Sequence, residues 1–288
     1  MMAAMEPARS HRGDLDACGG VPVVERRVSF DSVTEIYDRI RHSYPPEAFA
    51  DLFAYLREQR NVAAPEILEI GPGTGKATRG LLDAGGRVTA VELGTRMVEF
   101  LRSAFADEPA LRVVEGSFED VELAPASFDV VTAATAFHWI DPAVRIDKSI
   151  ELLEPCGVLA SLATVQVDSQ QANGFFEKSD PIYAKYQDDK GGGYVAPSFD
   201  EATPPEFEEF RAHPRLREVV LHRYRWDQTY SSAEYADLLR SYSNMQIMAA
   251  ADREALIAEL CELLETEFGG RVVRPLAIAL TMARRAPE

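Results

Sequence analysis

A glycine-rich loop is the part of the chain whose residue types and spacing best suit ligand chemistry. Glu69-Ile70-Gly71-Pro72-Gly73-Thr74-Gly75 follows a short apolar run and precedes a helical pattern. Glycine lets the backbone turn sharply and approach a ligand closely. The first amides of the following helix point at whatever lies beyond the strand. The loop therefore predicts a ligand site at the carboxyl end of the first strand.

The spacing of this loop excludes the two common phosphate-binding loops. A Walker A loop has four residues between its first glycine and Gly-Lys, and Ser or Thr follows. Here three residues separate Gly71 from Gly75, and Ala77 follows Lys76. A dinucleotide loop has the form G-x-G-x-x-G, but the last position counted from Gly71 is Lys76.

Two later segments add polar groups at the ends of expected strands. Glu92 ends the second apolar run, 21 residues after Gly71, and a carboxylate there can accept both ribose hydroxyls of a nucleoside. Ser117 and Phe118 follow the third run, and Thr135 follows the fourth. The carboxyl ends of parallel strands share one edge of a sheet, so these groups should border one crevice.

The pattern Glu69-x-Gly71-x-Gly73-x-Gly75 resembles the first motif of class I S-adenosylmethionine-dependent methyltransferases. The resemblance covers residues 28–165 and continues more loosely to the last strand. Phe137-His138-Trp139 before Asp141-Pro142 is similar to a bacterial small-molecule subfamily. The resemblance implies S-adenosylmethionine as the cofactor, bound by Tyr37, Arg41, Glu69, Gly71, Gly73, Gly75, Glu92, Leu93, Ser117, Phe118, Thr135 and Ala136.

The resemblance also suggests roles for particular side chains. Tyr37 and Arg41 would cover the methionine end of the cofactor, with Arg41 pairing its carboxylate through two donors. His42 stands where the family usually has proline. Ser117 replaces the usual acid that accepts from the adenine amino group, and Phe118 could pack on the ring.

His138 is the candidate for direct involvement in the reaction. Its ordinary pKa near 6.5 suits a general base, but it could equally position Trp139 or cap a helix. We expect His138 to be the only histidine in the crevice, since His11, His42, His213 and His222 are expected elsewhere. The expected substrate-binding residues are His138, Trp139, Tyr194, Trp226 and Tyr242.

Alternating elements must position these residues. Short apolar runs and helical patterns alternate from residue 66, which predicts a parallel sheet covered on both faces. The resemblance makes this a Rossmann-like, seven-stranded sheet with a reversed last strand. The expected strands are Glu66–Ile70, Arg87–Glu92, Leu111–Glu115, Phe128–Ala134, Gly157–Thr164, Leu216–Arg225 and Leu276–Ala283. The main expected helices are 46–60, 75–84, 95–105, from Pro142, 232–241 and 250–267.

The predicted domain organisation has five parts. They are a disordered tail (1–27), a helical cap (28–60), the cofactor-binding core (61–165), a substrate lid (166–213) and the completion of the core (214–288).

Composition limits the classes of partner. The net charge is −17, and an acidic surface repels nucleic acid and anionic membranes. No apolar run is long enough to span a bilayer, and three scattered cysteines fit a reducing cytoplasm. Acidic residues show no metal-ligand spacing.

We therefore expect transfer of a methyl group to N or O of a small apolar or aromatic molecule, with a role in natural-product biosynthesis implied by resemblance only. A non-catalytic cofactor-binding regulator and an enzyme of non-methyl chemistry remain alternatives. The sequence leaves the oligomeric state open.

Overall fold

One mixed sheet organises the protein. The computed structural model describes residues 34–168, 170–186 and 195–287. Seven strands lie in the order β3-β2-β1-β4-β5-β7-β6, which confirms the predicted Rossmann-like α/β fold. They are β1 (Glu66–Ile70), β2 (Arg87–Glu92), β3 (Leu111–Glu115), β4 (Phe128–Ala134), β5 (Leu153–Gln166), β6 (Leu216–Ser231) and β7 (Arg271–Arg285).

Strand direction fixes where ligands can approach. β1 to β5 pair in parallel, whereas β7 runs antiparallel to both β5 and β6, so the reversed last strand is confirmed. The strand order reverses between β1 and β4, which lie side by side. Open α/β sheets bind ligands outside the carboxyl ends of the strands at such a switch point. The glycine-rich loop follows β1 at this point.

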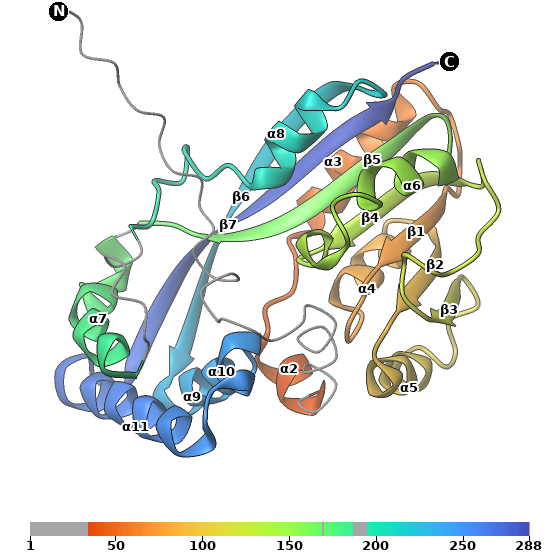
Figure 1. Ribbon diagram of the computed structural model, residues 1–288. Helices are drawn as coiled ribbons and strands as arrows, with labels where there is room; N and C mark the ends of the chain where they lie inside the picture. The colour runs from red at the N-terminus through yellow and green to blue at the C-terminus, as the bar shows by residue number, and fades with distance from the viewer. Residues whose placement is uncertain (1–33, 169, 187–194, 288) are drawn as a thin grey trace, which may run out of the picture.

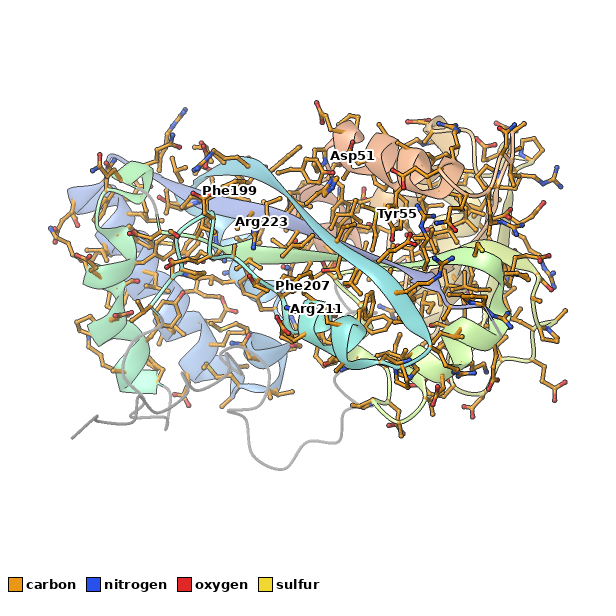
Figure 2. The ribbon with its side chains drawn as sticks, turned by 90° about the horizontal axis from the view of Figure 1, so that it is seen from above. Asp51, Tyr55, Phe199, Phe207, Arg211 and Arg223 are labelled. Carbon is orange, nitrogen blue, oxygen red and sulfur yellow. The ribbon has the colours of Figure 1, made fainter. Side chains whose placement is uncertain are left out.

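Helices cover both faces of the sheet (Figure 1). Apolar residues of α3 (Pro46–Arg57) and α4 (Lys76–Asp83) pack on one face. α6 (Arg145–Leu152) and α8 (Pro205–Ala212) pack on the other. Figure 2 shows labelled side chains of α3 and α8 on opposite sides of β6. α5 (Thr95–Ala104) packs against β2 and β3.

A second group of helices lies around the far ends of β6 and β7 (Figure 1) and is called the cap from here on. It differs from the helical cap predicted over 28–60, because α3 of that segment packs on the sheet. It consists of α2 (Thr34–Ile40), α7 (Phe175–Tyr186), α9 (Ser232–Arg240), α10 (Ser243–Ile247) and α11 (Ala250–Glu267). Their apolar side chains form one cluster centred on Phe175, Tyr235 and Leu260.

Three strands are longer than the sequence predicts, and β5 spans Leu153–Gln166 where Gly157–Thr164 was expected. β6 was expected to end at Arg225 and continues to Ser231, and β7 begins at Arg271 instead of Leu276. Beyond the last residue of β5, Gln166, the two strands pair only with each other. Polar residues and Pro275 hid this extension, because a two-stranded ribbon needs no continuous apolar run.

α6 starts later than expected. Asp141 was predicted to cap a helix beginning at Pro142, but the helix begins at Arg145. Asp141 Oδ1 accepts a hydrogen bond from the Ala143 amide at 2.9 Å, which closes a turn before the helix. Two 3-10 turns complete the elements, η2 (Phe137–Trp139) and η3 (Gln170–Ala172).

The predicted lid, 166–213, contains two helices. α7 belongs to the cap and packs against α11, whereas α8 packs on the sheet. The predicted tail, 1–27, lies outside the described residues. In the described part of the chain, no helix combines the length and apolar character of a membrane span.

Candidate active site

The glycine-rich loop turns away from β1 through three left-handed residues. Gly71, Gly73 and Gly75 have φ of +63°, +57° and +88°. A Cβ on Gly71 would lie 2.8 Å from the Cβ of Ala136, and one on Gly75 would lie 2.5 Å from the Phe105 ring. Glycine is thus required at both positions by packing against neighbouring elements.

Gly73 differs from the other two glycines because space lies above it. A Cβ there would meet nothing nearer than the Tyr37 ring, 3.9 Å away. The backbone at Gly73 can therefore be approached by a ligand, with the ring of Tyr37 opposite. This places two predicted cofactor-binding residues together.

Glu69 lies fully buried at the end of β1, under the loop. The Thr78 hydroxyl donates to its Oε2 at 2.6 Å, while Oε1 has no hydrogen-bond partner among the described residues. Burial raises the pKa of this carboxyl to about 7, and the nearby Glu92 adds to the rise. A cation bound above the loop would favour the ionised form of Glu69 and lower its pKa.

Glu92 ends β2 beside the loop, as predicted. Its Oε2 accepts from the Gly73 amide at 3.0 Å, and its Oε1 accepts from the Gly94 amide at 2.9 Å. These two backbone amides hold the carboxylate of Glu92 in place at the end of β2, and a carboxylate can accept hydrogen bonds from hydroxyl donors. Leu93, half-buried, follows it.

Thr135 extends β4 into the same edge in a strained conformation. Its φ is +53°, which is unusual for a β-branched residue. Its Oγ1 lies 2.9 Å from the Tyr44 hydroxyl and 3.4 Å from Thr164 Oγ1. Ala136 follows and contacts the glycine loop as described. Backbone strain of this kind is typical of functional sites.

Arg41 joins the segment after α2 to the end of α9. Its Nε donates to Ser241 Oγ at 3.0 Å, and its Nη2 donates to the Ser241 carbonyl at 3.1 Å. Its guanidinium lies 5.0 Å from the ring centre of Tyr37 and 4.4 Å from that of Tyr242. No carboxylate of the described residues pairs with Arg41.

The predicted adenine segment is arranged differently. Ser117 Oγ donates to Asp120 Oδ2 at 2.7 Å and accepts from the Asp120 amide at 3.1 Å. Phe118 is only 1% exposed and packs in the core with Ile70 and Val131, with the ammonium of Lys148 5.3 Å from its ring centre. In this structure Phe118 offers no free ring face to a ligand.

His138 lies in η2, directly after the carboxyl end of β4. Its ring centre is 5.0 Å from that of Trp139. Burial lowers the pKa of His138 to about 4, and the positive charge of Arg145 lowers it further. Arg145 is itself fixed by bonds to the Phe137 carbonyl and to Glu209. His138 is therefore neutral at pH 7 and weakly basic.

His42 corrects the expectation that His138 is the only histidine at this edge. His42 Nδ1 lies 2.8 Å from the Ser43 carbonyl, and its Nε2 lies 3.2 Å from Thr164 Oγ1. Since the carbonyl can only accept, Nδ1 carries the proton and Nε2 accepts from Thr164. Burial lowers the pKa of His42 to about 4, with Arg41 and Arg274 adding to the decrease.

The sequence could not separate His42 from an ordinary loop histidine. The one indication in the sequence was that His42, two residues before Tyr44-Pro45, stands where the family usually has proline.

The predicted substrate residues are spread over the carboxyl edge and the cap. Trp139 accompanies His138, while Trp226 lies on β6, with its ring centre 6.3 Å from that of His42. Tyr242 stands at the start of α10, in contact with Arg41. Tyr194 lies outside the described residues.

A groove of about 680 Å³ crosses the outer side of α4 between α3 and α5. It reaches Thr74 and Gly75 but not Glu92, Thr135 or His138. The groove is therefore separate from the strand ends that carry the predicted residues. Within residues 34–168, 170–186 and 195–287, no three His, Cys, Asp or Glu side chains gather as metal ligands.

Known proteins share both the sequence and this fold. Residues 68–161 match the family model described as a methyltransferase domain. The chain is 30% identical over 239 residues to an uncharacterized methyltransferase of Mycobacterium tuberculosis, covering 83% of this chain and 86% of that protein.

Two solved structures show the same fold. A protein of Anaeromyxobacter dehalogenans, described as a type II methyltransferase, matches with a TM-score of 0.55 and 22% identity over 85% of this chain and 97% of that chain. Phosphoethanolamine N-methyltransferase 2 of Haemonchus contortus, solved with S-adenosylmethionine, matches with a TM-score of 0.51 and 15% identity, covering 94% of this chain and 61% of that chain. On the strength of the sequence relatives and the family model, the chain belongs to the class I S-adenosylmethionine-dependent methyltransferases.

Proposed function

We propose that the enzyme methylates N or O of a small apolar or aromatic molecule and that it positions the acceptor instead of deprotonating it. The observation that carries this proposal is the surroundings of the two histidines at the carboxyl edge, where burial and nearby arginines lower the pKa of His138 and of His42 to about 4. A base this weak takes little part in removing a proton from an amine or a phenol.

The residues at the switch point fit S-adenosylmethionine. Gly73 leaves room for close backbone approach, and Glu92 is held at the end of β2 for a ribose. The Oε1 of Glu69 is a buried acceptor without a partner among the described residues, which suits the positive charge of the cofactor. When bound, the cofactor supplies a methyl group on a sulfonium, which already makes it electrophilic.

The protein's own contribution is then geometric. Holding two reactants in line can lower a barrier by about 7–11 kcal/mol. Thr135 is fixed by Tyr44 and Thr164 at the end of β4, and His138 follows it with no hydrogen bond to another described residue. We infer that these side chains orient an acceptor whose nucleophile is a neutral amine or an already ionised oxygen.

The class of molecule that the enzyme methylates is inferred from the net charge of the protein and from the side chains of the cap. The net charge of −17 disfavours nucleic acid, and the aromatic side chains of the cap favour a small molecule with apolar parts. Resemblance to the bacterial small-molecule subfamily supports a role in natural-product biosynthesis, and the three scattered cysteines support a cytoplasmic location.

Transfer of labelled methyl tests this function. Purified enzyme and S-[methyl-¹⁴C]adenosylmethionine are incubated separately with the low-molecular-weight, protein and RNA fractions of the producing cell. We expect label in the small-molecule fraction. Label confined to RNA or protein would contradict the proposal. At saturating S-adenosylmethionine, any pH dependence of the turnover between 6 and 8 should be the same in His138→Gln as in the wild type, since no histidine acts as base.

A further inference from the structure

A partly buried arginine without an acidic partner lies where β7 leaves the seven-stranded sheet. Arg274 sits in the two-stranded ribbon, just past the end of β5. Its Nη2 donates to Gln166 Oε1 at 2.6 Å, and its Nη1 donates to the Tyr242 hydroxyl. Its Nε is buried and has no partner among the described residues.

The surroundings of Arg274 are aromatic and neutral. Four tyrosines lie close enough to interact with it electrostatically, namely Tyr183, Tyr230, Tyr235 and Tyr242. No Asp or Glu in the part of the chain that the structure describes forms an ion pair with it. A guanidinium removed from water needs a compensating charge or a full set of acceptors. Arg274 has two neutral acceptors for its five N–H groups.

Other cations gather on the same side of the sheet. The guanidinium of Arg41 lies 4.4 Å from the ring centre of Tyr242, whose hydroxyl Arg274 binds. Three cations act on His42; Lys76 is paired with Asp38, whereas Arg41 and Arg274 form no ion pair with an acidic side chain of the described residues. In a protein with 47 acidic and 30 basic residues, this region is locally positive. A positive, partly dry region favours an anion.

The position of Arg274 relative to the cofactor loop fits an acceptor. Thr164 and Gln166 are alternate residues of β5, so they point to the same face and lie about 7 Å apart. Thr164 is 3.4 Å from Thr135, at the switch point, and Gln166 binds Arg274. Two residues of β5 and the side chain of Gln166 therefore separate the switch point from Arg274, a span that a small aromatic acid can bridge.

We propose that the methyl acceptor carries a carboxylate and that Arg274 binds this group, with Tyr242 and Gln166 holding the guanidinium in position. The proposal rests on the proposed function and extends it to the substrate class. Arg41 keeps its predicted role toward the carboxylate of the cofactor, so the two arginines serve different anions. The carboxylate would sit at the cap end of the site and the nucleophile at the switch point.

The test compares acids with their amides. The probes are 4-aminobenzoate, 4-hydroxybenzoate and 4-hydroxycinnamate, each beside its primary amide, titrated by calorimetry into the protein saturated with S-adenosylhomocysteine. We expect at least one acid to bind about tenfold or more tightly than its amide, since the amide lacks the charge that the guanidinium pairs. Equal binding of all acids and amides would overturn the proposal, and this comparison needs no variant.

Variants then assign the preference to Arg274. Arg274→Gln should remove the difference between acid and amide while changing the affinity for S-adenosylhomocysteine less than about twofold. Arg274→Lys should keep part of the difference. Arg271→Gln, an exposed arginine on the same strand, is the matched control and should change neither. If Arg274→Gln weakens S-adenosylhomocysteine binding and leaves the acid preference intact, Arg274 binds the cofactor and the proposal is wrong.

The same titrations without S-adenosylhomocysteine separate the two proposals. If the protein binds neither S-adenosylmethionine nor its product, the proposed function fails, while preference for acids over amides still supports an anion site at Arg274. If the cofactor binds and no acid is preferred, only the carboxylate proposal fails.

Discussion

Substituting Gly73 separates ligand approach from folding. Gly73 has φ of +57°, and a Cβ there would be 3.9 Å from the nearest other side chain, that of Tyr37. In Gly73→Ala the left-handed conformation costs about 1–2 kcal/mol, and the smaller entropy of the unfolded chain offsets about 0.4–1 kcal/mol of this. The expected loss of unfolding free energy is therefore about 1 kcal/mol, or about 2–4 °C in Tm.

Gly269→Ala is a matched control for that cost. Gly269 has φ of +63° and nothing within 4 Å of an added Cβ, and it lies after α11, remote from the loop. Both variants should lose similar stability in thermal unfolding. Only Gly73→Ala should lose affinity for S-adenosylmethionine, by about tenfold or more, because its methyl group occupies the ligand's side of the loop.

Calorimetric titration with S-adenosylmethionine measures the affinity of both variants. Retained affinity in Gly73→Ala with the expected drop in Tm would refute the assignment of this loop. Equal loss of affinity in Gly269→Ala would show that strain, not ligand approach, is responsible.

Three further outcomes follow from the buried groups. Glu69 has a pKa of about 7, and a bound cation should lower this pKa, so cofactor binding near pH 7 should release protons. Calorimetry in buffers of different ionisation enthalpy should show the release. Glu69→Gln should abolish it. The pKa of His138 is about 4 when folded and near 6.5 when unfolded, so the unfolded state binds more protons between these values and wild-type stability falls as pH falls from 6.5 to 4. His138→Gln should therefore become more stable relative to wild type over that range in urea titrations, by up to about 3 kcal/mol, and an unchanged difference would contradict the buried, neutral state. Tyr44→Phe removes the hydrogen bond to Thr135 (2.9 Å) and should cost about 1 kcal/mol in unfolding free energy; a loss below about 0.3 kcal/mol would mean that Thr135 holds its conformation without it.

Strand positions in the core could be read from the sequence because burial leaves little choice of residue. β1, β2, β3 and β4 have the predicted bounds, since each is a short apolar run ended by Gly, Pro or a polar residue. The reversed last strand was predicted only through the resemblance, as no local pattern encodes strand direction.

The cap and its ribbon were harder to predict. Residues 226–231 mix polar and aromatic side chains, and residues 271–275 mix arginine, valine and proline. Their pairing depends on a partner some 40–50 residues away. Apolar periodicity gave the bounds of α11, but the mutual placement of α2, α7 and α9 depends on tertiary packing.

Site residues that belong to a sequence motif were predicted to lie together and do so in the structure, whereas site residues outside a motif were not predicted. Gly73, Tyr37 and Glu92 meet at the switch point. His42, Thr164 and Arg274 reach the same edge from three distant segments. The residues next to them in the sequence do not indicate that they lie close together. Their proximity results from the β5–β7 register and from the path of the chain after α2.

The ribbon of β6 and β7 has a mechanical consequence for ligand entry. The two strands pair from the core at Leu216 to the cap at Ser231, with one irregularity between Arg217 and Val220, over a length of about 50 Å. A swinging motion of the cap would have to bend or break this ladder, so the cap and core should keep a fixed separation.

Among the cap helices, α2 is attached differently, because it also contacts the core. It contacts α5 of the core and α9 of the cap, with ion pairs from Arg39 to Asp237 and from Asp38 to Lys76. Both ion pairs include an exposed side chain and are therefore weak. We expect cofactor exchange to involve displacement of α2 from α5, while the other cap helices are held in place by the ribbon.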